Sequence, residues 1–142
     1  MAIKTYDPKN ISLIIGTHIV DGFEDGTFVS IERNNDTWTL KKGASGESAR
    51  AKSNDRSGRF TFTLMQTSLS NDFLSALAIS DEKNNNGLVP VLVLENGGLT
   101  AAEATEAWVI KPSNVEYSKE IGSRAWVLET GELILNVGGI VS

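Results

Sequence analysis

The chain has 142 residues, a formal net charge of −5, a single histidine and no cysteine. Without cysteine it cannot form disulfides, thiolate zinc sites or cysteine nucleophiles, and one histidine cannot make a multi-histidine metal site. The length suits one domain with a hydrophobic core, so we expect residues 1–142 to form a single domain. No apolar run approaches the roughly 20 residues that span a bilayer, and we therefore expect no membrane segment.

The first elements are short and separated by turn residues. Residues 1–10 are polar and are predicted to form an N-terminal arm. Short apolar strands are expected at 11–16 and 18–20, followed by two Asp/Gly turn signals at 21–26. Residues 27–33 alternate, and Val29 and Ile31 form the expected core face of this strand. The next strand, 37–40, places Trp38 and Leu40 on one side.

Charge is concentrated after this strand. The segment 41–59 contains two acidic residues and six basic ones, which are Lys41, Lys42, Arg50, Lys52, Arg56 and Arg59. Its charge is therefore +4, and the rest of the chain must carry −9. The segment has no hydrophobic periodicity up to Gly58, so it is predicted to be a long basic loop, functional or disordered.

A strand and a helix follow and are expected to organise the core. Phe60, Phe62 and Leu64 alternate on one face of the predicted strand. The helix is predicted over 68–82, with Ser70 as its N-cap. Its apolar face is Phe73, Leu74, Leu77 and Ala78.

The last third reads as further strands. They are expected at 88–94, 107–110, 125–128 and 132–137, with a hairpin turn at 96–98 and either a loop or a helical turn at 99–105. Pro90 argues against a central position for the first of them, because proline cannot donate to a ladder. The junction at 130–132 reads as a hairpin or a glycine bulge. Many short strands and one helix predict a mainly β fold, a β-sandwich or barrel with a flanking helix.

No catalytic motif is present. A Ser-His-Asp triad would have to use His18, which lies in a strand-like run and is better explained as a strand-edge or interface histidine. Residues 21–26, with Glu32, match part of a calcium loop, but Phe23 occupies a position that must supply an oxygen ligand. We therefore predict no enzyme, no cofactor and no metal site, and expect a protein that associates. The N-terminal arm, the basic loop and the apolar tail 133–141 could each reach a neighbour.

Several segments together carry a family resemblance. They are Met1-Ala-Ile-Lys-Thr-Tyr-Asp-Pro-Lys-Asn10, Gly26-Thr-Phe-Val-Ser-Ile-Glu-Arg33, Ser53-Asn-Asp-Arg-Ser-Gly-Arg59, Leu64-Met-Gln-Thr-Ser68, Ser70-Asn-Asp72, Ala107-Trp-Val-Ile-Lys-Pro112 and Trp126-Val-Leu-Glu-Thr-Gly131. In this order, over almost the full chain, the sequence resembles the tail tube proteins of contractile-tailed (myovirus-type) bacteriophages.

The resemblance implies a structural virion protein of the phage tail, made in the host cytoplasm. Six subunits would close into a ring, and rings would stack into a hollow tube through which DNA is ejected. The implied partners are other copies of the chain, the tail sheath and the baseplate. Genomic DNA would pass without specific binding, since phosphate affinity comes mainly from Lys and Arg and the body is acidic.

The basic loop suits a contact that stacks one ring on the acidic body of the next. A solvated loop and a nucleic-acid contact are alternatives, the latter disfavoured by the absence of aromatic residues in the loop. Two other functions remain open. One is a tube subunit of a secretion system, and the other is a monomeric β-sandwich binding module that uses Trp38, Trp108 or Trp126 as a platform.

Overall fold

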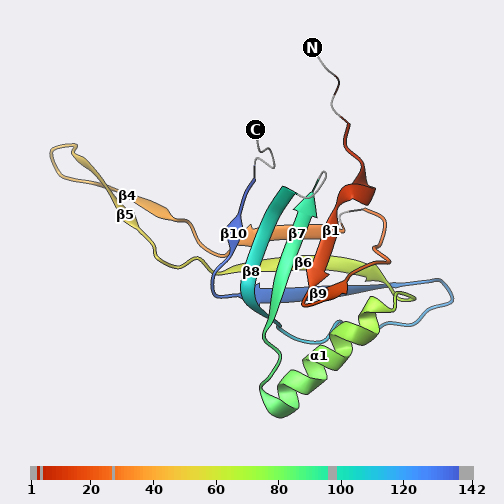
Figure 1. Ribbon diagram of the computed structural model, residues 1–142. Helices are drawn as coiled ribbons and strands as arrows, with labels where there is room; N and C mark the ends of the chain where they lie inside the picture. The colour runs from red at the N-terminus through yellow and green to blue at the C-terminus, as the bar shows by residue number, and fades with distance from the viewer. Residues whose placement is uncertain (1–2, 4, 27, 96–98, 138–142) are drawn as a thin grey trace.

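The computed structural model describes residues 3, 5–26, 28–95 and 99–137. Within these residues it shows a strand-rich body with one α-helix at its side and a two-stranded hairpin that projects away from it (Figure 1). The prediction of a mainly β fold with a flanking helix is confirmed. The short 3-10 helix η1, Pro8–Asn10, precedes the first strand.

One antiparallel sheet forms the body. Its strands are β1 (Ser12–Ile15), β2 (His18–Ile19), β3 (Val29–Arg33), β6 (Gly58–Met65), β7 (Val89–Glu95), β8 (Leu99–Val109), β9 (Ser123–Thr130) and β10 (Ile134–Leu135). They follow the order β2-β1-β7-β8-β9-β6-β3, and β10 pairs with β8. In Figure 1, β1 and β7 run across β6 and β9, so the sheet folds over on itself. The long β8 connects the two halves, because it pairs with β7 and, at Ala107 to Val109, with β9.

The core confirms the predicted organising strand and helix. β6 lies between β3 and β9, and Phe60, Phe62 and Leu64 are almost completely buried. Helix α1, Ser70–Asn84, packs the predicted apolar face against this core, with Leu74 and Ala78 buried. β3 also presents the expected face, with Val29 and Ile31 packed against the core.

The predicted N-cap was wrong. Ser70 is the first residue of α1 rather than its cap, and the cap position belongs to Leu69, whose side chain makes no capping hydrogen bond. The Ser70 side chain is fully buried and bonds to other elements. The hydroxyl of Ser68 accepts a hydrogen bond from the Ser70 backbone N–H at 3.2 Å, so Ser68 satisfies a free backbone N–H at the start of the helix.

The predicted long loop was also wrong. Two strands, β4 (Trp38–Lys42) and β5 (Ser48–Lys52), pair as an antiparallel hairpin between Arg33 and Gly58. Its end is closed by the backbone N–H of Gly43, which donates to the carbonyl of Glu47 at 2.8 Å. The strand predicted at 37–40, from Trp38 and Leu40 on one side, is confirmed as part of β4. Every residue of both strands is exposed, and β5 has no large apolar residue, so no apolar alternation marked the second strand.

Pro90 does not keep its strand at an edge, because β7 lies between β1 and β8. The proline stands where the pairing with β8 shifts register, between Val89 and Val91, and where β1 has already ended. Its carbonyl still accepts from the backbone N–H of Gly16 at 2.8 Å. A bulge thus removes the need for the missing N–H.

The last segments differ from prediction in length and pairing. Residues 99–105 are neither loop nor helix but the first part of β8. The strand expected at 132–137 is confined to β10, which pairs with β8, so the junction at 130–132 forms neither a hairpin nor a bulge within one strand. Leu133 is fully buried and completes the core. The expected turn at 96–98 and the tail beyond residue 137 lie outside the described residues.

Candidate functional site

The hairpin, here called the hairpin arm (residues 38–52), has two different faces. Directly opposite residues on antiparallel strands share a face. The pairs Trp38 with Lys52, Leu40 with Arg50 and Lys42 with Ser48 therefore form one face. The other face carries Thr39, Lys41, Ala49 and Ala51. Apolar and basic residues are thus combined on one side of the arm.

Two large apolar side chains on this face are exposed to solvent. Trp38 is 45% and Leu40 is 67% exposed. The guanidinium carbon of Arg50 lies 3.7 Å from the centre of the Trp38 ring, and the Lys52 ammonium lies 6.0 Å from it. These distances fit cation–π contacts, in which the cationic groups lie over the face of the indole ring.

The structure divides the six basic residues singled out in the sequence. Lys42, Arg50 and Lys52 share the face with Trp38, and Lys41 lies on the opposite face. The other two lie at the foot of the arm. The backbone of Arg56 forms an isolated parallel β-bridge with Glu132. Arg59 on β6 forms an ion pair with Glu129, with 3.1 Å between Nε and Oε1.

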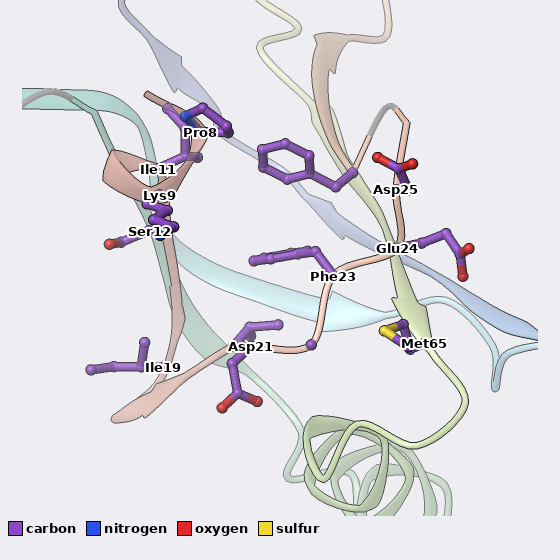
Figure 2. Close-up of a pocket in the computed structure, with 13 residues that line it drawn as sticks. Pro8, Lys9, Ile11, Ser12, Ile19, Asp21, Phe23, Glu24, Asp25 and Met65 are labelled. Carbon is purple, nitrogen blue, oxygen red and sulfur yellow. The ribbon is translucent and has the colours of Figure 1, made fainter. Parts of the chain in front are cut away.

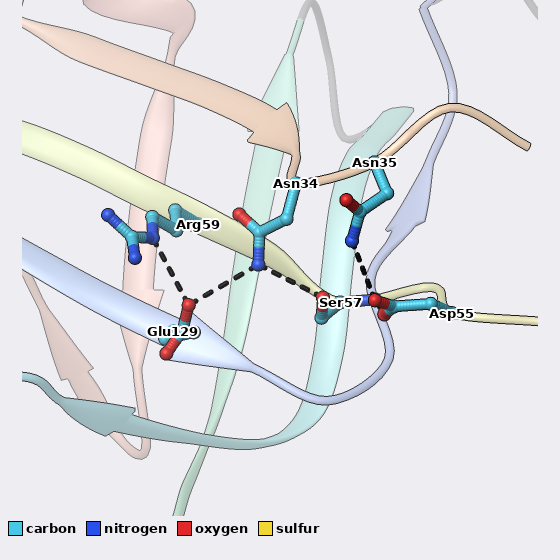
Figure 3. Close-up of polar contacts among 6 residues, drawn as sticks. All are labelled: Asn34, Asn35, Asp55, Ser57, Arg59 and Glu129. Atoms are coloured by element: carbon cyan, nitrogen blue, oxygen red, sulfur yellow. Dashed lines mark hydrogen bonds and ion pairs between the residues drawn. The ribbon is translucent and has the colours of Figure 1, made fainter.

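A polar network fixes the foot of the hairpin arm (Figure 3). The Asn34 side chain donates to Ser57 Oγ and to Glu129 Oε1, and the Asn35 side chain donates to Asp55 Oδ2 at 2.6 Å. Asp55 Oδ1 accepts from the backbone N–H of Ser57 at 2.9 Å, and this hydrogen bond is the main reason that the pKa of Asp55 lies below its ordinary value of 3.8. The chain entering the arm is thereby tied to the chain leaving it.

A pocket of about 630 Å³ lies at the other end of β3 and β6, here called the end pocket (Figure 2). η1, β1, the 20–25 loop, Phe28 and Met65 surround it. Its apolar lining is Ile11, Ile19, Val20, Phe23, Phe28 and Met65. Its charged residues are Asp21, Glu24, Asp25 and Lys9, so carboxylates outnumber cations by three to one. The size is in the range of pockets that bury a sizeable ligand.

Backbone hydrogen bonds hold the 20–25 loop of the pocket against β6. The N–H of Glu24 donates to the carbonyl of Thr63 at 3.0 Å, and the N–H of Met65 donates to the carbonyl of Gly22 at 2.8 Å. The Phe23 and Phe28 rings lie 5.2 Å apart, tilted to one another. The sequence indicated turns and an incomplete calcium loop here, so this surface was missed, although its Gly, Phe and acidic residues were visible.

The one histidine takes part in a structural cluster. His18 Nε2 lies 2.8 Å from Ser70 Oγ, which also donates to Asp21 Oδ1 at 3.2 Å, and the His18 ring stacks on Phe73 with 4.4 Å between centres. In a catalytic triad the aspartate is hydrogen-bonded to the histidine, and the serine is accessible to the substrate. Here the aspartate contacts the serine, and Ser70 is fully buried. The position of His18 on the edge strand β2 agrees with the expected strand-edge histidine.

The described part of the chain offers neither a metal site nor a membrane-spanning helix. No group of three or more His, Asp or Glu side chains there is placed to hold a metal ion. No helix in the described ranges is long and apolar enough to cross a bilayer.

Comparison with known proteins gives one curated relative and several structural neighbours. No family model matches the chain. The structural protein ORF10 of Pseudomonas phage KPP10 is 29% identical over 144 aligned positions, which cover 96% of this chain and 83% of that protein.

The structural neighbours come from contractile injection systems. A chain of the cap that terminates the tube of the anti-feeding prophage matches with a TM-score of 0.61, over 96% of this chain and 94% of that one, at 11% identity. A chain of the PVC sheath/tube terminator matches with a TM-score of 0.62, over 96% and 99%, at 11% identity. A chain of the PVC sheath–tube complex matches with a TM-score of 0.56, over 93% of this chain and 91% of that one, at 12% identity.

The relative is a structural protein, in agreement with the prediction that the chain is not an enzyme. The predicted likeness to phage tail proteins is confirmed at the level of a phage structural protein. The chain is a homologue of a phage structural protein, and its fold is shared by chains of contractile injection systems.

Proposed function

We propose that the chain is a subunit of the tube of a contractile phage tail. Six copies close into a ring, rings stack into a hollow tube, and the tube is surrounded by the sheath and joined to the baseplate. The observation that carries the proposal is the fold match over 91–99% of chains from tube-containing contractile assemblies. The phage relative favours a phage tail over the tube of a secretion system.

The edges of the sheet support assembly into rings. β3 pairs with β6 on one side, and in the described part of the chain no strand pairs with its other side. β2 ends the sheet at the opposite edge. Unpaired edges favour pairing with other chains, and closing several subunits into one barrel removes them.

The distribution of charge supports the stacking of rings. The hairpin arm and its foot carry Lys41, Lys42, Arg50, Lys52, Arg56 and Arg59, while the rest of the chain has a formal charge of −9. We assign the contact between rings to the arm, with the cations facing an acidic surface of the next subunit. Arg59 contributes least, because Glu129 of the same chain already neutralises it.

A second candidate function follows from the neighbours that terminate tubes. Two of the matches, with TM-scores of 0.61 and 0.62, are to chains of a tube-terminating cap and a sheath/tube terminator. A terminator would form one ring at the tube end, whereas a tube protein would be repeated along the tail. The number of copies in a virion separates the two.

The first test is negative-stain electron microscopy of the purified chain, combined with its mass in solution. Tubes with a central channel support the tube protein, and single rings that never stack support the terminator. A monomer at high protein concentration and over a range of salt overturns both. It returns the binding module to first place, with the exposed Trp38 as its platform.

Charge reversal tests the stacking surface. The triple change of Arg50, Lys52 and Arg56 to Glu should leave the fold and the rings intact but shorten or abolish the tubes. The matched control reverses three exposed lysines away from the arm, Lys83, Lys111 and Lys119. Tubes of normal length from the arm variant would remove the arm from the stacking contact.

A further inference from the structure

We propose that the end pocket receives the hairpin arm of a neighbouring copy of this chain. The face that docks carries Trp38, Leu40, Arg50 and Lys52, and the surface that receives it is the 20–25 loop with Phe28. This inference rests on the proposed function, because it names the two surfaces that meet when the chain assembles.

The hairpin arm is not expected to be stable without further contacts. A two-stranded hairpin is marginally stable in water, and this one exposes Trp38 and Leu40 on the same face. Exposed apolar patches rimmed by polar groups mark interaction surfaces. Trp and Arg are also the residues that most often dominate the binding energy of an interface. The arm therefore has the composition of an inserting element.

The end pocket has the complementary chemistry. Its apolar wall includes Phe23 and Phe28, and Ile19, which also lines the pocket, is 64% exposed. Glu24 and Asp25 line the same pocket, and Figure 2 shows both on the loop above Met65. An aromatic and a leucine side chain can bury against the apolar wall while the guanidinium and ammonium groups meet the carboxylates. Opposite potentials on facing surfaces fix the orientation of a contact.

The arm cannot fill the pocket of its own chain. The arm leaves the body between Arg33 and Gly58, where β3 ends and β6 begins. The pocket is lined by Phe28 and Met65, which lie where β3 begins and β6 ends. Eight residues of strand separate the two ends by roughly 25 Å at about 3.3 Å per residue. In Figure 1 the arm also points away from the body.

The contact must therefore join two copies head to tail. Each copy offers an arm at one end and a pocket at the other, so every contact leaves one free arm and one free pocket. A heterologous interface of this kind closes a ring or extends without limit, and because the arm is assigned to the contact between rings, here it extends the stack. This property suits a chain that works as a repeated unit.

Cross-linking tests the contact directly, because the chain has no cysteine of its own. Leu40→Cys and Asp25→Cys are made as separate full-length proteins, mixed under assembly conditions and treated with a short bismaleimide, and the linked peptides are identified by mass spectrometry. The control replaces Leu40→Cys by Thr39→Cys, one residue away on the opposite face. We expect the 40–25 link to exceed the 39–25 link by about tenfold, as for a contact of fixed orientation.

Charge exchange provides a second measurement. Arg50→Glu with Lys52→Glu, and Glu24→Lys with Asp25→Lys, should each raise the protein concentration needed for assembly by about tenfold or more. Combining all four changes in one chain should restore most of the loss, because the two surfaces interact. The matched control, Lys83→Glu with Lys119→Glu, reverses two exposed lysines away from the arm and should change little.

The outcomes distinguish this inference from the proposed function. Rings or tubes that lack the 40–25 link, or that give equal links from residues 39 and 40, overturn the docking and leave the proposed function standing. A four-charge variant that assembles no better than either two-charge variant also overturns it. A wild-type chain that stays monomeric, together with cysteine variants that form no link, overturns both.

Discussion

The guanidinium of Arg50 on β5 lies over the indole of Trp38 on β4, with 3.7 Å between its central carbon and the ring centre. The two residues are diagonal neighbours across the hairpin, since Trp38 pairs with Lys52 and Leu40 pairs with Arg50. A cation–π contact at an exposed site contributes about 0.5–1 kcal/mol. This is enough to favour one orientation of the tryptophan in an arm that little else constrains.

Replacing Arg50 by Ala should make Trp38 easier to quench. The reason is that the guanidinium covers one face of an indole that is already 45% exposed, whereas Trp126 is 3% exposed. The measurement is acrylamide quenching of tryptophan fluorescence, with Trp38→Phe as the control that removes the accessible signal. Equal quenching of the wild-type and Arg50→Ala chains would contradict the stacking.

Ser70→Ala should destabilise the body by about 1–3 kcal/mol, the cost of leaving buried polar partners unpaired. Ser70 Oγ contacts His18 Nε2, the Asp21 carboxylate and the Asp21 backbone N–H. The readout is urea unfolding followed by circular dichroism. Ser113→Ala, which removes an exposed hydroxyl, is the matched control and should change the unfolding free energy by less than about 0.5 kcal/mol. Equal effects of the two changes would remove the cluster from the account of stability.

Hydrophobic periodicity in the sequence was sufficient to predict which residues of β6 and α1 face the core. Phe60, Phe62 and Leu64 alternate because one face of β6 is buried, and the structure buries all three. The apolar face of α1 was visible for the same reason, since its side chains recur at helical spacing. Each of these patterns records which side of an element faces the core, and so the predicted fold class was correct.

The surfaces that we propose for assembly are harder to predict from the sequence. The hairpin arm has both faces in solvent, and although Trp38 and Leu40 alternate in β4, no apolar alternation marks β5. The end pocket is built from η1, β1, the 20–25 loop and β6, which are brought together only by the sheet. The basic residues were found by counting charge, but their division between two faces and the foot depends on register, which no composition reveals.

The foot of the hairpin arm should loosen on acidification. The pKa of Asp55 is lowered mainly by the hydrogen bond from the Ser57 backbone N–H, so the folded state favours the carboxylate. A group with a lowered pKa stabilises above its unfolded value, here 3.8, and loses that contribution as the pH falls through the folded value. Hydrogen-exchange protection of residues 53–58 should therefore be steady near neutral pH and fall below about pH 4. In Asp55→Asn this pH-dependent loss of protection should be absent, and its persistence there would assign the change to another group.

Gly58→Ala should destabilise the body, whereas Gly131→Ala should not. A Cβ at Gly58 would meet the Leu133 side chain and the backbone carbonyl oxygen of Glu32, the latter at 2.8 Å. The carbonyl belongs to β3, which is paired with β6 at this point, and Leu133 is fully buried, so neither group can retreat without moving a strand or the core. At Gly131 the Cβ would meet nothing within 4 Å. We expect a loss of about 1–3 kcal/mol for Gly58→Ala, as for overpacked cores, measured by urea unfolding. Equal unfolding free energies for the two variants would show that β3 and β6 can separate at this end without cost.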